Sequence, residues 1–134
     1  MKKIFVNGTF DIVHYGHLSL LRYAKNLGDY LLVAIDSDAR VKELKGEARP
    51  INNLYERLSL LQSLKFVDDV LVFGSSKELD DIISIYKPNI VVRGSDHSSS
   101  SVPHGKVVFY DRLQNYSSSA KIEKIFLGRT HEKI

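Results

Sequence analysis

The apolar run from Tyr30 to Ile35 restricts the fold most, because it shows no alternation of apolar and polar residues. A strand that is buried on both faces has this pattern, and such strands are typical of parallel sheets covered by helices on both sides. The run is the longest apolar one in the chain and is far too short to cross a bilayer. We therefore expect an interior strand of a parallel sheet.

Short apolar segments alternate along the chain with segments of helical spacing. We predict the other strands at residues 3–7, 70–73, 90–92 and 106–110, and helices at 18–27, 54–64, 77–86 and 117–127. Residues 36–51 are expected to be irregular or to hold a short helix. With right-handed crossovers, this order predicts an α/β fold: a single-domain, doubly wound, mostly parallel five-stranded sheet of Rossmann-like type. The domain is expected to span residues 1–127, followed by a loose C-terminal tail at 128–134.

Composition narrows the function classes. Of the 134 residues, 43% are hydrophobic and 26% charged, which excludes a disordered chain, a collagen and a coiled coil. Cysteine is absent, so disulfides, thiolate zinc sites and a cysteine nucleophile are excluded. No apolar signal segment follows the two N-terminal lysines, and we predict a cytoplasmic protein. The net charge of +3 is compatible with a small phosphorylated ligand; we predict neither nucleic acid nor a membrane as a partner.

The unusual polar residues gather after predicted strands. In doubly wound sheets, ligands bind beyond the carboxyl ends of the strands, at the point where the strand order reverses. Four segments follow predicted strands and qualify as site candidates: residues 8–17, 36–49, 93–97 and 112–119.

The first of these segments runs Gly8-Thr9-Phe10-Asp11-Ile12-Val13-His14-Tyr15-Gly16-His17. Gly8 permits a tight turn, and Gly16 permits a ligand to approach the backbone closely. His14 and His17 stand three residues apart where a helix begins, so both imidazoles lie on one side of a helix N-terminus that attracts phosphate. Two alternatives stay open: structural histidines at a helix start, or a metal site, for which no third histidine stands nearby.

This segment matches the G-x-F-D-x-x-H-x-G-H signature, and the chain resembles the cytidylyltransferase-like nucleotidyltransferases. Residues 116–122, Tyr-Ser-Ser-Ser-Ala-Lys-Ile, are similar to the late serine and threonine motif of that superfamily. Residues 44–52 with Glu56 and Arg57, and Arg93-Gly94-Ser95-Asp96, resemble the nucleotidyltransferase domain of ADP-heptose synthases. The resemblance covers residues 3–126; glycerol-3-phosphate cytidylyltransferase is the next most similar family.

The resemblance implies transfer of a nucleoside monophosphate from a triphosphate to a sugar phosphate, with release of pyrophosphate. The favoured reaction is ATP with D-glycero-D-manno-heptose 1-phosphate to give ADP-heptose. The alternative is CTP with glycerol 3-phosphate, or another polyol phosphate, to give a CDP-alcohol. Mg²⁺ is expected with the triphosphate, and a homodimer is usual among relatives. A phosphate nucleophile is already ionised at neutral pH, so the protein needs to align two anions and neutralise charge rather than supply a general base.

The resemblance also implies roles for individual residues. His14, His17 and Lys45 would be catalytic. The residues expected at the nucleotide are Gly8, Thr9, Phe10, His14, Gly16, His17, Arg93, Gly94, Asp96, Arg112, Tyr116, Ser117, Ser118 and Ser119. The residues expected at the acceptor are Asp11, Asp38, Lys45 and Arg57. Taken alone, Lys45 and Arg57 read as surface charges, Ser117 to Ser119 as a helix cap, Tyr15 as a pocket wall and Asp11 as a residue that holds the turn. A regulatory module without turnover is the rival interpretation, against which the intact histidine pair argues.

Overall fold

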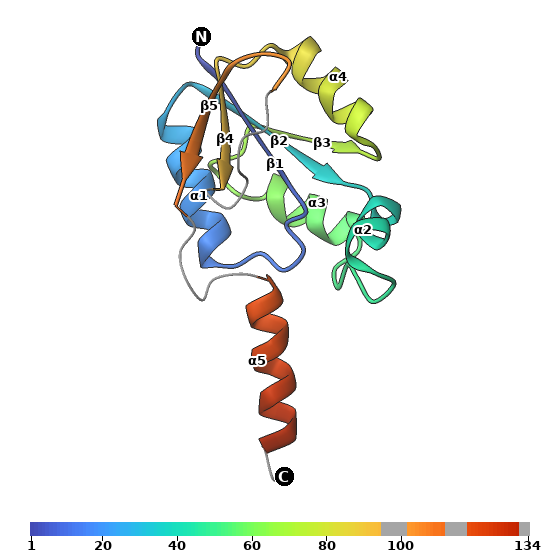
Figure 1. The fold of residues 1–134 in the computed structure, drawn as a ribbon. Coiled ribbons are helices and arrows are strands. Elements are labelled where there is room, and N and C mark those ends of the chain that lie inside the picture. The colour runs from blue at the N-terminus through green and yellow to red at the C-terminus, as the bar shows by residue number, and fades with distance from the viewer. Residues whose placement is uncertain (95–101, 112–117, 132–134) are drawn as a thin grey trace.

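The computed structural model describes residues 1–94, 102–111 and 118–131 (Figure 1). The predictions for Asp96, Arg112, Tyr116 and Ser117 lie outside these residues. The elements, in chain order, are β1 (Lys3–Gly8), α1 (Tyr15–Asn26), β2 (Tyr30–Asp36), α2 (Asp38–Lys45), α3 (Leu54–Gln62), β3 (Asp69–Phe73), α4 (Ser76–Tyr86), β4 (Ile90–Gly94), β5 (Lys106–Tyr110) and α5 (Ser118–His131).

The five strands form one sheet in the order β3-β2-β1-β4-β5, and every neighbouring pair is parallel. This confirms the predicted fold class. Leu31 to Ile35 are buried, as the lack of alternation in this run indicated. The strand order reverses between β1 and β4, so their carboxyl ends mark the expected ligand site.

The two faces of the sheet carry separate cores, because successive side chains of a strand point to opposite faces. One core joins Ile4, Val6 and Val33 to Leu21 of α1 and Leu61 of α3. The other core packs the intervening strand residues against α4, and its buried members are Phe5, Leu32, Ala34, Phe73, Ile83 and Val91. Side chains at the strand ends therefore point to either the α1 face or the α4 face.

The helix boundaries differ from the sequence predictions at their ends. Helix α1 begins at Tyr15 rather than at residue 18, because His14 caps it. The segment 36–51 does hold a short helix, α2, capped by Ser37. The expected loose tail from residue 128 is wrong for 128–131, because α5 continues through Gly128 to His131; one glycine costs a helix only about 1 kcal/mol relative to alanine. Helix α5 projects away from the sheet (Figure 1).

Gly28 lies just beyond the C-cap of α1, directly after the helix predicted at 18–27, and the structure shows why a glycine is needed there. The residue before it, Leu27, is the C-cap with ordinary right-handed backbone angles. A Cβ atom at Gly28 would stand 2.8 Å from the side chain of Ile4 and 2.8 Å from the backbone oxygen of Lys2. The glycine therefore lets the end of α1 pack directly against the start of β1.

We predict that Gly28→Ala lowers the free energy of unfolding by about 1–3 kcal/mol, because an inserted methyl group overpacks this contact. Urea denaturation followed by circular dichroism measures the change. Gly128→Ala is the control: outside the backbone of its own helix, no described atom lies within 4 Å of a Cβ placed there, so the change should leave stability equal or raise it by up to about 1 kcal/mol. An unchanged denaturation midpoint for Gly28→Ala would contradict the assignment.

Candidate active site

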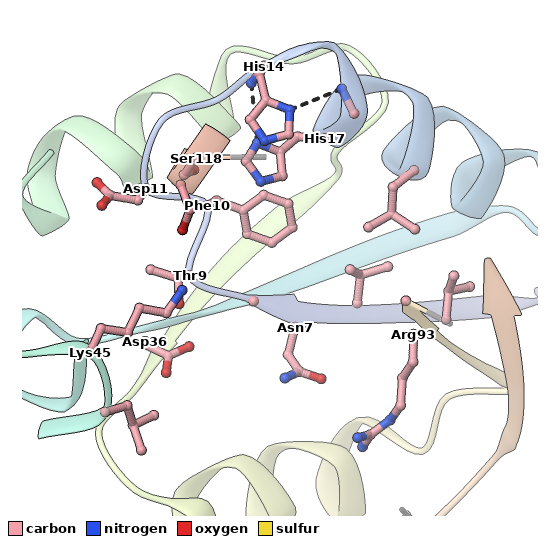
Figure 2. Close-up of a pocket in the computed structure, with 18 of the residues that line it drawn as sticks. Asn7, Thr9, Phe10, Asp11, His14, His17, Asp36, Lys45, Arg93 and Ser118 are labelled. Atoms are coloured by element: carbon pink, nitrogen blue, oxygen red, sulfur yellow. Dashed lines mark hydrogen bonds between the residues drawn. The ribbon is translucent and has the colours of Figure 1, made fainter. Parts of the chain in front are cut away.

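A cavity of about 510 Å³ opens at the carboxyl ends of the strands (Figure 2). It contains all of the described residues that the sequence assigned to the site, except Asp38 and Arg57. Those that line it are Gly8, Thr9, Phe10, Asp11, His14, Gly16, His17, Lys45, Arg93, Gly94, Ser118 and Ser119. Tyr15, expected as a pocket wall, is 51% exposed and is not among the lining residues. The segments that the sequence singled out after β1, β2 and β4 thus meet in one place.

The two histidines form a reciprocal cap at the start of α1. His14 is the N-cap residue, and its Nδ1 accepts a hydrogen bond of 3.1 Å from the backbone N–H of Gly16. His17 Nδ1 accepts one of 3.2 Å from the backbone N–H of His14. Their rings stack with centroids 3.8 Å apart, and Phe10 packs on His17 at 4.9 Å. The imidazoles therefore have a structural role in starting the helix.

This cap also determines which ring nitrogen carries the proton. A ring nitrogen that accepts an N–H bond bears no hydrogen, so each neutral imidazole carries its hydrogen on Nε2. Nε2 is then a hydrogen-bond donor, and both rings line the cavity. The structural and the phosphate-binding interpretations of the pair are thus compatible, because each uses a different nitrogen.

Ser118 brings the start of α5 to the same place. Its hydroxyl accepts from the backbone N–H of Ile12 at 3.1 Å and lies 3.2 Å from the backbone oxygen of Ile12, to which it donates. Ser119 follows it on the lining of the cavity. The N-terminal end of a second helix therefore lies beside the loop that carries the histidines, and helix N-termini favour anions.

Asp11 holds the loop between β1 and α1 against the segment before α3. Its carboxylate accepts from Arg49 Nε at 2.8 Å, from the Ile51 N–H at 3.0 Å and from the Asn52 N–H at 2.8 Å. Burial acts to raise the pKa of Asp11, but these hydrogen bonds and the Arg49 charge outweigh it and hold that pKa below its ordinary value. These bonds favour the interpretation that Asp11 holds the turn.

Arg57 is the largest fully buried side chain of the described residues, with 0% of it exposed. Its guanidinium donates to three backbone oxygens, those of Thr9 at 3.1 Å, Asp36 at 2.8 Å and Asn52 at 3.0 Å. It also donates to the Asp38 carboxylate at 2.6 Å. These partners take up four of the five N–H donors of Arg57, so the geometry supports a role in positioning the site rather than direct contact with an acceptor.

The cavity also contains polar residues that sequence reasoning missed. Asn7, Asp36 and Arg40 line it. Asn7 ends the first apolar strand and Asp36 ends the run that begins at Tyr30, so a polar residue directly after a buried strand was the available signal. Burial raises the pKa of Asp36, although the charges of Arg40, Arg57 and Lys45 act in the opposite direction.

Residues 5–124 match the cytidylyltransferase-like family. The chain belongs to this family and is, by class, a nucleotidyltransferase. Within the described part of the chain, no helix combines the length and the hydropathy that a membrane span needs.

The chain is similar to bifunctional HldE proteins and to a solved structure. The chain is 44% identical over 128 residues to the bifunctional protein HldE of Campylobacter jejuni subsp. doylei, covering 92% of this chain and 28% of that protein. It is 45% identical over 134 residues to the bifunctional protein HldE of Helicobacter pylori, covering 97% and 28%. The chain thus spans less than a third of the length of these relatives. A crystal structure of the lipopolysaccharide core biosynthesis protein from Thermoplasma volcanium superposes with a TM-score of 0.73 at 27% identity, covering 85% of this chain and 99% of that one.

We predict that Arg57→Ala lowers the free energy of unfolding by about 3–5 kcal/mol, because it leaves buried carbonyl groups and a carboxylate without their donor. Arg57→Lys is expected to recover little of the loss, since an ammonium cannot reproduce the planar fork. Chemical denaturation measures both. Lys77→Ala, which removes an exposed ion pair with Asp81, is the control and should change the value by less than about 1 kcal/mol. A wild-type denaturation midpoint for Arg57→Ala would refute the positioning role.

Proposed function

We propose that this protein transfers the adenylyl group of ATP to D-glycero-D-manno-heptose 1-phosphate, forming ADP-heptose and pyrophosphate. The observation that carries the proposal is the stacked pair His14 and His17: both residues line a cavity beside a helix N-terminus, and backbone N–H groups bind Nδ1 of each ring. The similarity to HldE proteins over 92% of the chain supports the heptose acceptor.

The chain's residues supply what the reaction requires. An oxygen of the acceptor phosphate attacks the α-phosphorus of the triphosphate, and the bond between that phosphorus and the oxygen of the leaving pyrophosphate breaks. Negative charge is distributed over the α-phosphate oxygens and the leaving group in the transition state. His14 and His17 donate hydrogen bonds from Nε2 to those oxygens, and the N-terminus of α1 adds its dipole. Lys45, at the end of α2, adds a positive charge on the acceptor side.

Mg²⁺ enters as part of the substrate, bound to the triphosphate. Among the described residues, no group of three or more histidines and carboxylates could hold a metal ion. A Mg²⁺ ion that keeps its waters and binds substrate phosphates needs no such cage, so these residues fit a magnesium–triphosphate substrate. Association into a homodimer stays a prediction from the resemblance.

A pyrophosphate-release assay tests the reaction. We expect the highest kcat/KM for ATP with heptose 1-phosphate when ATP, CTP, GTP and UTP are each combined with heptose, hexose, glycerol and polyol phosphates. Mass spectrometry of the product should show ADP-heptose. Preference for CTP with glycerol 3-phosphate would replace this proposal by the CDP-alcohol reaction, and binding without pyrophosphate release from any pair would indicate a regulatory module.

We predict that His14→Asn lowers kcat by about 100- to 1,000-fold while the unfolding temperature stays close to that of the wild type. Asparagine is a good N-cap and keeps an acceptor for the Gly16 N–H, but it lacks the Nε2 donor. The pyrophosphate assay and thermal denaturation measure the two effects. His14→Ala is the comparison variant, in which both activity and stability should fall. A wild-type kcat in His14→Asn would show that the ring acts only as a cap.

A further inference from the structure

Three polar side chains form a row across neighbouring strands on the α4 face of the sheet. Phe5, Leu32 and Val91 belong to the core on this face, and each strand residue an even number of positions further on points the same way. On β1, β2 and β4 these residues are Asn7, Asp36 and Arg93, all at the carboxyl ends. Figure 2 shows the three on one side of β1, with Phe10, His14 and His17 on the other.

The cavity is therefore divided by the end of β1 into two halves of different chemistry. The half on the α1 face contains the imidazole donors and the start of α5, which suit a triphosphate. The half on the α4 face has a carboxylate at one end, an amide in the middle and a guanidinium at the other end. Phe73 and Leu79 add apolar surface to this second half.

The row of Asp36, Asn7 and Arg93 favours a ligand that carries both a phosphate and hydroxyl groups. A guanidinium binds anionic oxygens, an amide both donates and accepts, and a carboxylate accepts from hydroxyl groups but repels phosphate. A ligand that fits has its phosphate away from Asp36 and a hydroxyl group against it. A phosphorylated sugar meets both conditions, and its carbon skeleton can pack on Phe73 and Leu79.

Asp36 has capacity to accept such a hydrogen bond. Its side chain lines the cavity although only 7% of the residue is exposed. Arg40 Nε lies 3.3 Å from its Oδ2, and the Arg57 bond goes to its backbone oxygen rather than to its side chain. A carboxylate offers about four acceptor positions, so the Arg40 contact leaves room for a ligand. Burial raises the pKa of Asp36, and the positive charges of Arg40, Arg57 and Lys45 act against that rise.

We propose that Asp36 determines acceptor specificity: its carboxylate accepts a hydrogen bond from a hydroxyl group of a phosphorylated sugar bound on the α4 face, while the triphosphate occupies the α1 face. This inference rests on the proposed function, because it needs an acceptor that carries both a phosphate and hydroxyl groups.

The test compares acceptors and variants in the pyrophosphate assay, with the full chain. The acceptors are heptose 1-phosphate and its singly deoxygenated analogues; the variants are Asp36→Ala, Asp36→Asn and, as a control, Glu43→Gln, an exposed carboxylate on α2. With the intact acceptor, Asp36→Ala should lose about 10- to 100-fold in kcat/KM for the acceptor. The KM for ATP should change by less than about two-fold, and Asp36→Asn should recover part of the loss, because its amide oxygen still accepts.

The deoxygenated acceptors separate binding from a structural role through Arg40. With the wild type, kcat/KM for one analogue should be about 10- to 100-fold lower than for the intact acceptor. With Asp36→Ala, the same deoxygenation should lower kcat/KM by less than about three-fold, because the contact is already absent. Equal losses for every analogue in the wild type and in Asp36→Ala would overturn the inference, as would a raised KM for ATP with an unchanged KM for the acceptor. Thermal denaturation checks that each variant is folded.

Failure of the proposed function gives a different result. If the wild type uses another phosphorylated polyol and not heptose 1-phosphate, the heptose assignment fails, and the same comparison with deoxygenated forms of that acceptor decides the role of Asp36. A wild type that is active with heptose 1-phosphate and an Asp36→Ala variant that equals it reject the role of Asp36 alone. A wild type that uses no phosphorylated sugar or polyol rejects both.

Discussion

Where parallel strands end, their loops leave backbone carbonyl groups that no neighbouring strand can satisfy, and in this protein one guanidinium binds several of them. Arg57 reaches from α3 to the oxygens of Thr9, Asp36 and Asn52. Because Thr9 follows β1 and Asp36 ends β2, this single side chain fixes the relative position of the two loops that carry the site. A buried charge is tolerated here since nearly all of its donors are satisfied and Asp38 supplies a counter-charge.

Because side chains alternate along the strands, the two faces of the sheet carry different chemical groups at the site. Val6 points into the core beneath α1, and Asn7, one residue later, points to the α4 face. A ligand that crosses the end of β1 therefore meets helix N-termini and imidazoles on one side, and a carboxylate and a guanidinium on the other. This arrangement suits a reaction between two anionic substrates, because each can be held on its own face with the reacting atoms between them.

Local patterns predicted much of this structure, and long-range contacts account for the rest. The strands, the approximate positions of the helices and the histidine pair follow from residues close together in sequence. The burial of Arg57 does not, because its partners Thr9 and Asp36 lie 48 and 21 residues away and the residue, taken alone, reads as a surface charge. Likewise, the sequence indicates Gly28 as a helix end, whereas its contact with Ile4 requires the folded sheet.

The proposed double use of the histidines, as a helix cap and as phosphate ligands, links the fold to the chemistry. A histidine that must act as a general base needs a nitrogen that can take up a proton, and here Nδ1 of each ring is already occupied by a backbone N–H. Attack by a phosphate oxygen removes that requirement, because the nucleophile is ionised before it binds. In the proposed reaction the rings need only donate from Nε2, so the same hydrogen bonds that start α1 would also keep the hydrogen on the nitrogen that donates. A reaction that required proton abstraction would need a ring nitrogen that can take up a proton, and the helix cap would have to release Nδ1 to provide it. The proposed reaction has no such requirement.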